Sequence, residues 1–439
     1  MRTPLGILTL AWWLIAAPSW AATYYVSQGA GGTPSGDNAR SCATAQTITT
    51  PKLTINAGVA CLIAGAPGDE VLVRGGTYQE AILDPPLTGT NFTTGKYRIA
   101  AYPSETVRIF PQSGEFVFNF AGTQAYIEID GFIIDGSLVT VNTIKIEAYT
   151  IAPSNQTPSH IRIQNSEIIG NTTTFDGACI QLVSAGAGTT GFNQILNNTI
   201  HACGESAGDL PDWGIYLQSA DNTLDGNTIY DAPGGIQLYN GYGNTINNTV
   251  ITRNIIRDLR ATPAIPSDRH SGITVYNAGT NNLIANNIIY GVPASTAGSI
   301  SAGVYVGITG TGLGIYNNTI VDNSGKGIFC ESATAPTVTN NLLVSNVGSN
   351  FDNACSATGS NNVTTGSGGF TNQGAHDYTL AIGSQAIDFG TPVGAVATDI
   401  LGVVARPQGS AYDAGAYERL VAGGNGGTIS HARQGLRRR

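Results

Sequence analysis

Short stretches in which apolar and polar side chains alternate recur along the middle of this chain. The stretch GIYLQSADNTLDGNTIYDAPGGIQLYNG, residues 214–241, contains a Gly-Ile-x-Leu phrase near both ends, with polar turn residues and Asn-Thr-Ile between the two copies. Alternation with a period of two is typical of β-strands, whereas an amphipathic helix would repeat its apolar positions every three or four residues. The pattern therefore predicts short strands separated by turns.

Two phrases of this kind repeat over most of the chain. Variants of Gly-Ile-x-Leu occur as GACIQL, GIYL, GIQL, GITV, GVYV and GIFC. The second phrase, Asn-x-Ile, recurs at intervals of 23 to 33 residues, and its copies are assigned to Asn165, Asn198, Asn227, Asn254, Asn287, Asn318 and Asn341. Such repetition indicates a solenoid, in which each coil carries at least two strands that stack in parallel on the next coil, about 4.8 Å away. We therefore expect an all-β fold, a right-handed parallel β-helix, since parallel strands are usually connected by right-handed crossovers.

The recurrent side chains have separate expected roles. Asn tolerates the left-handed backbone of tight turns, and Asn side chains stacked in successive coils can hydrogen-bond to one another as a ladder. Ile, Leu and Val at alternate positions are expected to point inward and to fill a narrow core.

Both ends of a solenoid need caps, because a terminal coil cannot bury its own open side. Residues 22–69 are expected to form an N-terminal cap with a helix that begins at Pro51, where proline is favoured. The segment GDEVLVRGGTY then supplies the first strand and turn of the β-helix, which is expected over residues 70–375. Residues 376–420 break the repeat and are expected to close the far end as an irregular C-terminal cap. The Gly- and Arg-rich residues 421–439 are expected to be a disordered tail.

The composition supports this fold and excludes one class of partner. The 439 residues include 57 glycines, and only 11% of the residues are charged, which suits short strands and tight turns. The net charge of −9 argues against binding to nucleic acid, because a phosphate-binding surface needs a basic face.

The first residues predict export. Arg2 precedes the apolar stretch LGILTLAWWLIAA, and the triplet SWA ends at Ala21 with the small residues of a cleavage site, so residues 1–21 are expected to be a signal peptide. The alternative is a membrane anchor, although the apolar stretch is short for a bilayer. No later segment is expected to span a membrane. The protein is therefore expected to be secreted, periplasmic or located at the cell surface.

Six cysteines follow the signal sequence and lie in three local couples. An even number in an exported chain favours disulfides, although six cysteines allow 15 connectivities. The spacing within each couple is about one coil, so local pairing is the simplest prediction: Cys42 with Cys61, Cys179 with Cys203, and Cys330 with Cys355. No couple has the Cys-x-x-Cys spacing of a zinc site.

Three parts of the chain carry a resemblance to a known superfamily. The beginning, YYVS…GDEVLVRGGTYQEAI…IAAYPSETVRI, resembles that of secreted right-handed parallel β-helix proteins of the pectate-lyase-like superfamily, and the Asn-x-Ile coils resemble their repeat region. The end, LAIGSQAID…DILG…RP…DAGAYE, is similar to the closing segment of bacterial β-helix proteins with a choice-of-anchor Q domain. The resemblance covers residues 23–420 and implies the fold and export.

Three insertions precede Gly-Ile strands on neighbouring coils and are expected to project from one edge of the solenoid. They contain Asp176, Asp212, and the run Asp268-Arg269-His270 together with Arg260. On the adjoining strands, side chains that alternate with the inward Ile and Leu point outward. We therefore place four tyrosines on this face, Tyr216, Tyr239, Tyr276 and Tyr305, and expect Trp213, next to Asp212, to line the groove beside them.

Carboxylates, a histidine, arginines and aromatic rings on one face have the composition of a sugar-binding cleft. The rings pack on sugar faces, and the charged groups bind hydroxyls or uronate carboxylates. The alternative is that the outward tyrosines are ordinary strand residues. His160 and His201 lie beside repeat turns and are expected to be structural. The expected partner is a polysaccharide, of acidic type, and the expected oligomeric state is a monomer.

The same residues fit more than one activity. A uronate lyase or epimerase neutralises the substrate carboxylate with calcium or Arg and removes the C5 proton with a base. Asp268, Arg269 and His270 supply these residue types, and they resemble part of the Asp-x-His motif of β-helix alginate epimerases and lyases. A glycoside hydrolase would need two carboxylates, for which Asp176 and Asp212 are the candidates. A non-catalytic binding or adhesion protein would use the same face. We expect the lyase or epimerase type first, assign no metal ligands, and keep Ca²⁺ as a candidate cofactor.

Overall fold

The computed structural model describes most of the chain from residue 21 to residue 420. The described residues are 21–151, 154–155, 157–172, 177–185, 190–204, 212–241, 245–261, 271–294, 300–307, 310–331, 336–352, 355 and 359–420. The expected signal peptide up to residue 20 and the expected tail lie outside them. So do four of the predicted site residues: Asp176, Asp268, Arg269 and His270.

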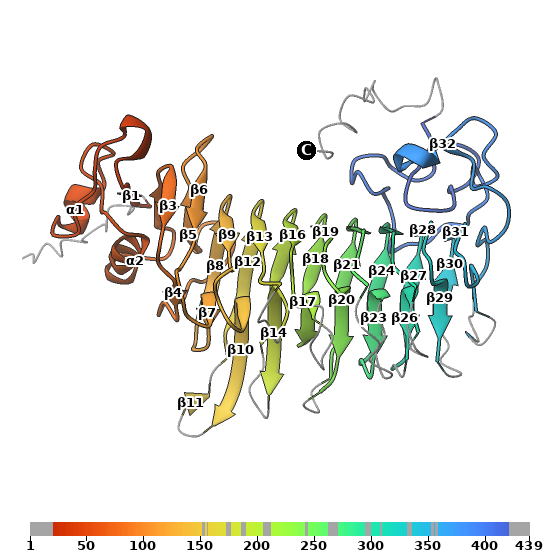
Figure 1. Cartoon of the computed structure of the whole chain (residues 1–439), viewed down its shortest axis with the longest axis horizontal. Coiled ribbons are helices and arrows are strands. Elements are labelled where there is room, and N and C mark those ends of the chain that lie inside the picture. Colours follow the sequence, from red (N-terminus) through yellow and green to blue (C-terminus); the bar gives the residue numbers. More distant parts are fainter. Residues whose placement is uncertain are drawn as a thin grey trace, which may run out of the picture.

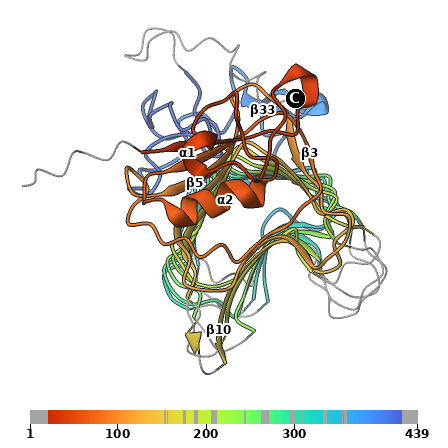
Figure 2. The same ribbon diagram turned by 90° about the vertical axis from the view of Figure 1, so that its left-hand side faces the viewer.

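Three long parallel sheets wind into a cylinder, and each complete coil contributes one strand to each sheet (Figures 1 and 2). Sheet 1 contains, in spatial order, β1 (Thr23–Val26), β2 (Glu70–Val73), β5 (Tyr97–Ala101), β8 (Ala125–Asp130), β12 (Ser159–Gln164), β15 (Gln194–Leu196), β18 (Thr223–Asp225), β21 (Val250–Thr252), β24 (Leu283–Ala285), β27 (Gly314–Tyr316) and β30 (Thr337–Thr339).

Sheet 2 is built from the Gly-Ile phrases, and sheet 3 from the Asn-x-Ile phrases. Sheet 2 contains β4 (Ile82–Leu83), β7 (Phe116–Phe120), β10 (Asn142–Ile151), β14 (Ile180–Ala185), β17 (Trp213–Gln218), β20 (Gly234–Tyr239), β23 (Ser271–Tyr276), β26 (Ala302–Val306) and β29 (Lys326–Cys330), with β11 (Ser154–Asn155) antiparallel beside β10. Sheet 3 contains β3 (Gly76–Tyr78), β6 (Val107–Ile109), β9 (Ile133–Asp135), β13 (Glu167–Ile169), β16 (Thr199–His201), β19 (Thr228–Ile229), β22 (Ile255–Arg257), β25 (Ile288–Tyr290), β28 (Thr319–Val321) and β31 (Leu342–Val344). The prediction of a parallel β-helix is confirmed.

The core consists of columns of inward side chains in register between coils. In all three sheets these side chains are fully buried, as the alternating pattern predicted. The central columns are Ile195, Leu224, Ile251, Ile284 and Ile315 in sheet 1, Ile215, Ile236, Ile273, Val304 and Ile328 in sheet 2, and Ile200, Ile229, Ile256, Ile289 and Ile320 in sheet 3.

An asparagine ladder runs along the turn before sheet 3. Each Asn side chain donates through Nδ2 to Oδ1 of the next Asn at 2.9–3.1 Å, from Asn198 through Asn227, Asn254, Asn287, Asn318 and Asn341 to Asn362. One phrase was aligned wrongly, because Glu167 pairs with Thr199 and so places Ser166, not Asn165, beside Asn198. Buried amides that are paired in this way satisfy one another and favour a single register of the coils.

The N-terminal end is covered by helices (Figure 2). The short elements η1 (Ala30–Gly32) and α1 (Cys42–Ala45) precede α2 (Ile55–Ala64). Helix α2 begins after Thr54, whose hydroxyl accepts from the Ala57 amide at 3.2 Å, four positions later than the start expected at Pro51. β1 lies upstream of these helices and pairs in parallel with β2, so the sheet begins before the segment that was expected to supply its first strand. No helix among the described residues is long and apolar enough to cross a bilayer.

All three predicted disulfides are present. Cys42–Cys61 joins α1 to α2, Cys179–Cys203 links two coils where sheet 3 connects to sheet 2, and Cys330–Cys355 joins the end of β29 to the following coil. The described part of the chain contains no free cysteine.

The C-terminal segment, residues 370–420, folds back over the outer face of sheet 3 (Figure 1). It contains β32 (Phe370–Asn372), η2 (Gln373–Ala375) and β33 (Asp377–Leu380), and then an irregular chain. Its apolar side chains pack on Ile288, Val321 and Leu342 of β25, β28 and β31. Residues 376–420 were expected to close the far end, and these contacts lie on the side of the cylinder instead.

Asparagines in three successive turns hold this segment. The side-chain amides of Asn286, Asn317 and Asn340 donate to the carbonyl oxygens of Thr398, Asp413 and Thr391 at 2.7–3.0 Å. All three asparagines have a positive φ, which projects their side chains away from the cylinder. The segment is thus attached to equivalent positions of neighbouring coils.

Candidate functional site

The predicted site face lies where sheet 3 connects to sheet 2. Residues 170–179, 202–212 and 258–270 each lead from a strand of sheet 3 to a strand of sheet 2, so the three insertions leave the same edge of the cylinder. The most reactive predicted residues on these insertions, Asp176 and the run Asp268-Arg269-His270, lie outside the described residues.

Three of the predicted tyrosines form a stack on the outer face of sheet 2. The ring centroids of Tyr216 and Tyr239 are 6.4 Å apart, and those of Tyr239 and Tyr276 are 5.8 Å apart. All three side chains are half-buried. Tyr305, on the next coil, is fully buried and packs beside Phe329 with 5.5 Å between centroids. Strand parity indicates which side chains point away from the cylinder. It does not show which of those side chains are then covered by other parts of the chain.

Three other predicted site residues are committed to structural contacts. Trp213 is buried, because it has the same parity as the inward Ile215 and its ring packs on the backbone of Gly234. Asp212 is also buried, and its carboxylate accepts from the Gly177 amide at 2.9 Å. Arg260 is part-buried and donates to the carbonyl oxygens of Cys203 and Gly204, and burial lowers the pKa of its guanidinium.

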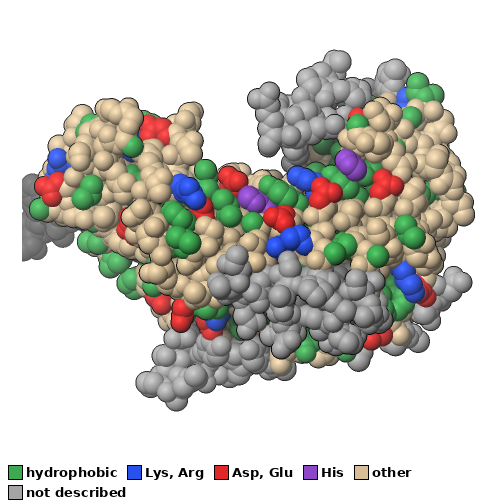
Figure 3. All heavy atoms as spheres, in the orientation of Figure 1, with side chains coloured by type: hydrophobic (Ala, Val, Ile, Leu, Met, Phe, Trp, Pro, Cys, Tyr) green, Lys and Arg blue, Asp and Glu red, His purple; other side chains and the backbone are tan. Residues whose placement is uncertain are grey.

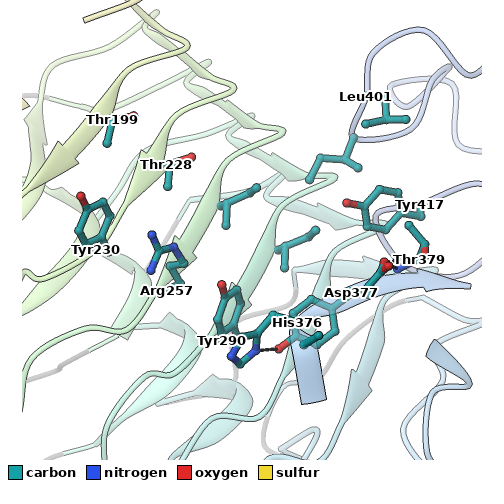
Figure 4. Close-up of a pocket in the computed structure, with 15 residues that line it drawn as sticks. Thr199, Thr228, Tyr230, Arg257, Tyr290, His376, Asp377, Thr379, Leu401 and Tyr417 are labelled. Atoms are coloured by element: carbon teal, nitrogen blue, oxygen red, sulfur yellow. Dashed lines mark hydrogen bonds between the residues drawn. The ribbon is translucent and has the colours of Figure 1, made fainter. Parts of the chain in front are cut away.

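A groove lined by aromatic, hydroxyl and charged side chains lies on the outer face of sheet 3 (Figures 3 and 4). Figure 3 shows this face hollowed between the N-terminal coils and the C-terminal segment, with charged, histidine and apolar side chains along it. Part of this groove is a cavity of about 320 Å³ between the strands and the C-terminal segment. The side chains that line it include Thr199, Thr228, Tyr230, Arg257, Tyr290, His376, Asp377, Tyr378, Leu401 and Tyr417.

One wall of the groove is a row of stacked side chains on successive coils. His201 and Tyr230 are nearly parallel, with ring centroids 4.9 Å apart, and the guanidinium carbon of Arg257 lies 4.4 Å from the centroid of Tyr230. Tyr290 follows in register with Arg257. Burial raises the pKa of Tyr230, and Arg257 opposes this shift, so the phenol stays protonated near neutral pH.

Carboxylates lie beside two nitrogen-bearing side chains of this row, His201 and Arg257. Nε2 of His201 lies 3.0 Å from a carboxylate oxygen of Glu167, and the guanidinium of Arg257 donates to Asp258 at 2.6 Å. Both carboxylates are largely exposed, at 42% and 55% of their side-chain surface. Both contacts therefore lie at the solvent-facing side of the groove.

The opposite wall comes from the C-terminal segment. His376 stacks on Tyr290 with 4.6 Å between ring centroids, and its Nδ1 lies 2.9 Å from the hydroxyl oxygen of Tyr378 (Figure 4). The Tyr378 hydroxyl in turn donates to Asp322 at 3.2 Å. Burial is the main cause that raises the pKa of Tyr378, and the carboxylate of Asp322 adds to it.

This wall-forming row was not recognised in the sequence, although the sequence contains a signal for it. In four consecutive phrases, NTIH, NTIY, NIIR and NIIY, the fourth residue is His201, Tyr230, Arg257 or Tyr290. This position alternates with the inward Ile and therefore points outward. A parity argument applied to the Asn phrases as well as to the Gly phrases would have placed a polar aromatic row on sheet 3. No comparable signal pairs that row with His376.

The described residues contain no group of three or more His, Cys, Asp or Glu side chains that could hold a metal ion. Among the described residues that line the cavity, Arg257 is the only Arg or Lys. Its guanidinium is therefore the permanent positive charge that the described lining offers to an anionic ligand.

Comparison with known proteins identifies the fold as a right-handed β-helix. The family model described as "Right handed beta helix region" matches residues 117–300 and, in a second overlapping placement, residues 211–380. The structure is similar to that of the pectate lyase Pel9A, with a TM-score of 0.61, 16% identity, and coverage of 91% of this chain and 97% of that chain. At this identity the likeness shows a shared fold, and with the family match it confirms the predicted right-handed winding.

Weaker structural similarities extend to two further proteins. A rhamnogalacturonan lyase has a TM-score of 0.46, with 14% identity over 80% of this chain and 91% of that chain. XylC in its complex with xylose has a TM-score of 0.44, with 12% identity over 74% of this chain and 75% of that chain. No curated protein matches the chain significantly in sequence.

Proposed function

We propose that this chain, which belongs to the right-handed β-helix family, binds an acidic polysaccharide in the groove of sheet 3 and acts on it as a lyase or epimerase. The observation that carries the proposal is the row His201–Tyr230–Arg257, which faces the C-terminal segment across a cavity of about 320 Å³. The similarity to the fold of a pectate lyase is consistent with it.

The acidic character of the proposed ligand follows from Arg257. Its guanidinium is one-third exposed and already binds the carboxylate of Asp258, so it has the orientation that a uronate carboxylate would need. Arg binds planar carboxylates through parallel hydrogen bonds, which suits recognition of such a group. We propose that the substrate carboxylate replaces Asp258 on this guanidinium.

The reaction type rests on the groups around this cation. Neutralisation of a uronate carboxylate makes its C5 proton more acidic, and a base beside it can then remove the proton. Two histidines are candidate bases: His376, which lines the cavity, and His201, which stacks on the lining residue Tyr230. The protonated phenol of Tyr230 is a candidate donor. Asp268, Arg269 and His270 remain candidates proposed from the sequence. Their segment follows β22, the strand that carries Arg257.

Export and the type of C-terminal segment belong to the same proposal. We propose that the chain is secreted, periplasmic or located at the cell surface, which suits three disulfides and a polysaccharide ligand. We also propose that residues 370–420 form a choice-of-anchor Q segment, on the resemblance of LAIGSQAID and DAGAYE.

The test is a screen of pectate, alginate and a neutral glycan. Absorbance of unsaturated uronate and the number of reducing ends are measured in parallel, and exchange of the C5 proton in deuterated water is followed by NMR. A lyase gives both new absorbance and new ends, and an epimerase gives exchange alone. New ends without absorbance would instead support a hydrolase. Each assay is run with Ca²⁺ and with EDTA, and equal rates would remove calcium from the proposal.

A second function is supported by the existing ion pairs of the groove. His201 and Arg257 already have carboxylate partners, Glu167 and Asp258, so the row is stable without chemistry. A non-catalytic carbohydrate-binding or adhesion protein would bind pectate or alginate in calorimetry and alter neither. Binding without turnover or exchange over long incubation would favour this function.

A further inference from the structure

We propose that His376 is the general base of the groove and that Tyr378 and Asp322 position it. This inference rests on the proposed function and specifies it: the substrate is a uronate-containing chain, and the proton acceptor comes from the C-terminal segment, not from the β-helix. The support is a chain of hydrogen bonds that fixes the orientation and the tautomer of one imidazole.

The backbone around His376 is fixed by local contacts. His376 follows η2 with a φ of 55°, and its amide donates to the carbonyl oxygen of Gln373 at 2.9 Å. At the start of η2, the side chain of Asn372 accepts from the Ala375 amide at 3.2 Å. The ring lies on Tyr290 of β25, with an interplanar angle of 18°. The imidazole is therefore held between the C-terminal segment and the wall of the β-helix, although the residue is exposed.

The direction of the hydrogen bonds determines the tautomer. The carboxylate of Asp322 accepts from Gln373 Nε2 at 2.6 Å and from the Tyr378 hydroxyl at 3.2 Å. Because the single phenolic proton is used in that bond, the Tyr378 oxygen can only accept from His376. Nδ1 of His376 then carries the proton, and Nε2 presents its lone pair. Among the described residues, no side chain or backbone group hydrogen-bonds to this Nε2.

His201, the other histidine of the groove, has the opposite arrangement. Its Nε2 lies 3.0 Å from the Glu167 carboxylate, which accepts a hydrogen bond from that nitrogen. Because this nitrogen is engaged with the carboxylate, it does not present a lone pair to a substrate. The carboxylate of Asp322 is one residue further from His376, with the Tyr378 hydroxyl between them. The two rings are therefore suited to different tasks, binding for His201 and proton transfer for His376.

The charged and titratable groups around His376 come from several elements. Asp322 follows β28, Tyr378 and Asp377 belong to β33, and Tyr290 belongs to β25. Tyr417 belongs to the same C-terminal segment, and Arg257 with its partner Asp258 lies on the wall formed by the β-helix. Carboxylates thus lie on both sides and a guanidinium on one, so the ring is not enclosed by charges of one sign.

The proposed step is a proton transfer followed by elimination. Arg257 binds the uronate carboxylate, and Nε2 of His376 takes the proton from C5. The electron pair of the C5–H bond forms the C4–C5 double bond as the C4–O4 bond breaks, and O4 leaves with its electron pair and takes a proton from water. The imidazolium returns its proton to solvent. If a proton is instead delivered to the other face of C5, the same first half gives the epimer.

The test compares His376→Ala, Tyr378→Phe and the unchanged protein on pectate and alginate. Loss of a general base typically lowers kcat 10²- to 10⁴-fold, and because His376 is exposed the protein should fold normally. Tyr378→Phe keeps the buried ring and removes only the hydroxyl, so it should lower kcat about tenfold with KM unchanged and shift the acid limb of the pH–rate profile. His160→Ala, a histidine stacked between Tyr126 and Phe192 outside the groove, is the control and should retain full activity.

A second measurement is independent of substrate. The ¹⁵N shifts of the His376 ring should show a protonated Nδ1 in the unchanged protein and a mixture of tautomers in Tyr378→Phe. Full activity of His376→Ala on a glycan that the unchanged protein converts would overturn the assignment and leave the proposed function intact. A protonated Nε2 in the unchanged protein would also overturn it. If neither glycan is bound or altered, the proposed function fails, and the assignment of a base fails with it.

Discussion

The guanidinium carbon of Arg257 lies 4.4 Å from the ring centroid of Tyr230, and the same guanidinium donates to the carboxylate of Asp258 at 2.6 Å. One planar cation therefore stacks on an aromatic ring with its face and binds a carboxylate with its edge. Lysine cannot do both, because its ammonium is a point charge on a flexible chain.

Arg257→Lys should therefore weaken binding of acidic glycans. A hydrogen bond to a charged group contributes about 1.5–3 kcal/mol, so we expect the Kd for pectate or alginate fragments to rise roughly 10- to 100-fold. Isothermal calorimetry measures this directly. Arg162→Lys is the control, since the Arg162 guanidinium also stacks on a ring, 3.9 Å from the centroid of Phe92, but outside the groove. Equal losses in the two variants would contradict a specific role of Arg257.

The two aromatic stacks can be compared with one another. Tyr230 belongs to the row on sheet 3, and Tyr276 belongs to the stack on sheet 2 that the sequence predicted as the site. We expect Tyr230→Ala to weaken glycan binding roughly tenfold, since a buried aromatic contact contributes about 0.5–1.5 kcal/mol and Arg257 loses its support. Tyr276→Ala should have a smaller effect. The reverse order in fluorescence titrations would return the site to sheet 2.

The asparagine ladder predicts a stability difference between two asparagines. Asn254 is fully buried, accepts from the amide and side chain of Asn227, and donates to the carbonyl of Leu224 and to Asn287. Asn254→Ala leaves several of these groups without partners, which should lower the free energy of unfolding by about 2–4 kcal/mol. Asn248 is exposed and donates to Asp221. Asn248→Ala should change it by less than about 0.5 kcal/mol in the same denaturant titration.

The C-terminal segment should become less stable as pH rises. Burial raises the pKa of Asp399 to about 6, and it also raises the pKa values of Asp413 and Glu418 beside the buried Arg406. A carboxyl whose pKa is higher in the folded state binds its proton more tightly there than in the unfolded chain, where the pKa is about 3.9. Its contribution to stability is therefore greatest below about pH 4 and is lost as pH rises to about 6.

Asp399→Asn tests this expectation. The amide keeps an oxygen that can accept from the Leu401 amide, as Asp399 does at 2.9 Å, and it carries no charge. The variant should be more stable at pH 7 by up to about 3 kcal/mol, with a flatter dependence between pH 4 and pH 6. Thermal melts at several pH values measure both. A destabilised Asp399→Asn at pH 7 would contradict the argument.

The features that could be predicted from the sequence are those that recur once in every coil. Ile229 and Ile256 are inward because side chains alternate, and Asn227 meets Asn254 because both occupy the same place in consecutive repeats. The contact between Tyr290 and His376 has no such origin, since His376 belongs to a segment without the repeat. Its position follows from contacts such as that of Asn286 with Thr398, 112 residues apart, which no local pattern predicts.

Because of the way in which the C-terminal segment is attached, the number of coils determines the length of ligand that the groove can hold. Asn286, Asn317 and Asn340 belong to three equivalent turns, so the segment recognises a type of turn and not an absolute distance from the N-terminus. Insertion of one complete coil between β13 and β16, before the row begins at His201, would move the C-terminal segment one strand spacing, about 4.8 Å, further from the N-terminal cap and leave both walls unchanged. Such a chain would bind a longer stretch of polymer with the same chemistry. Duplication of a single repeat is therefore a simple evolutionary route to a different oligosaccharide length.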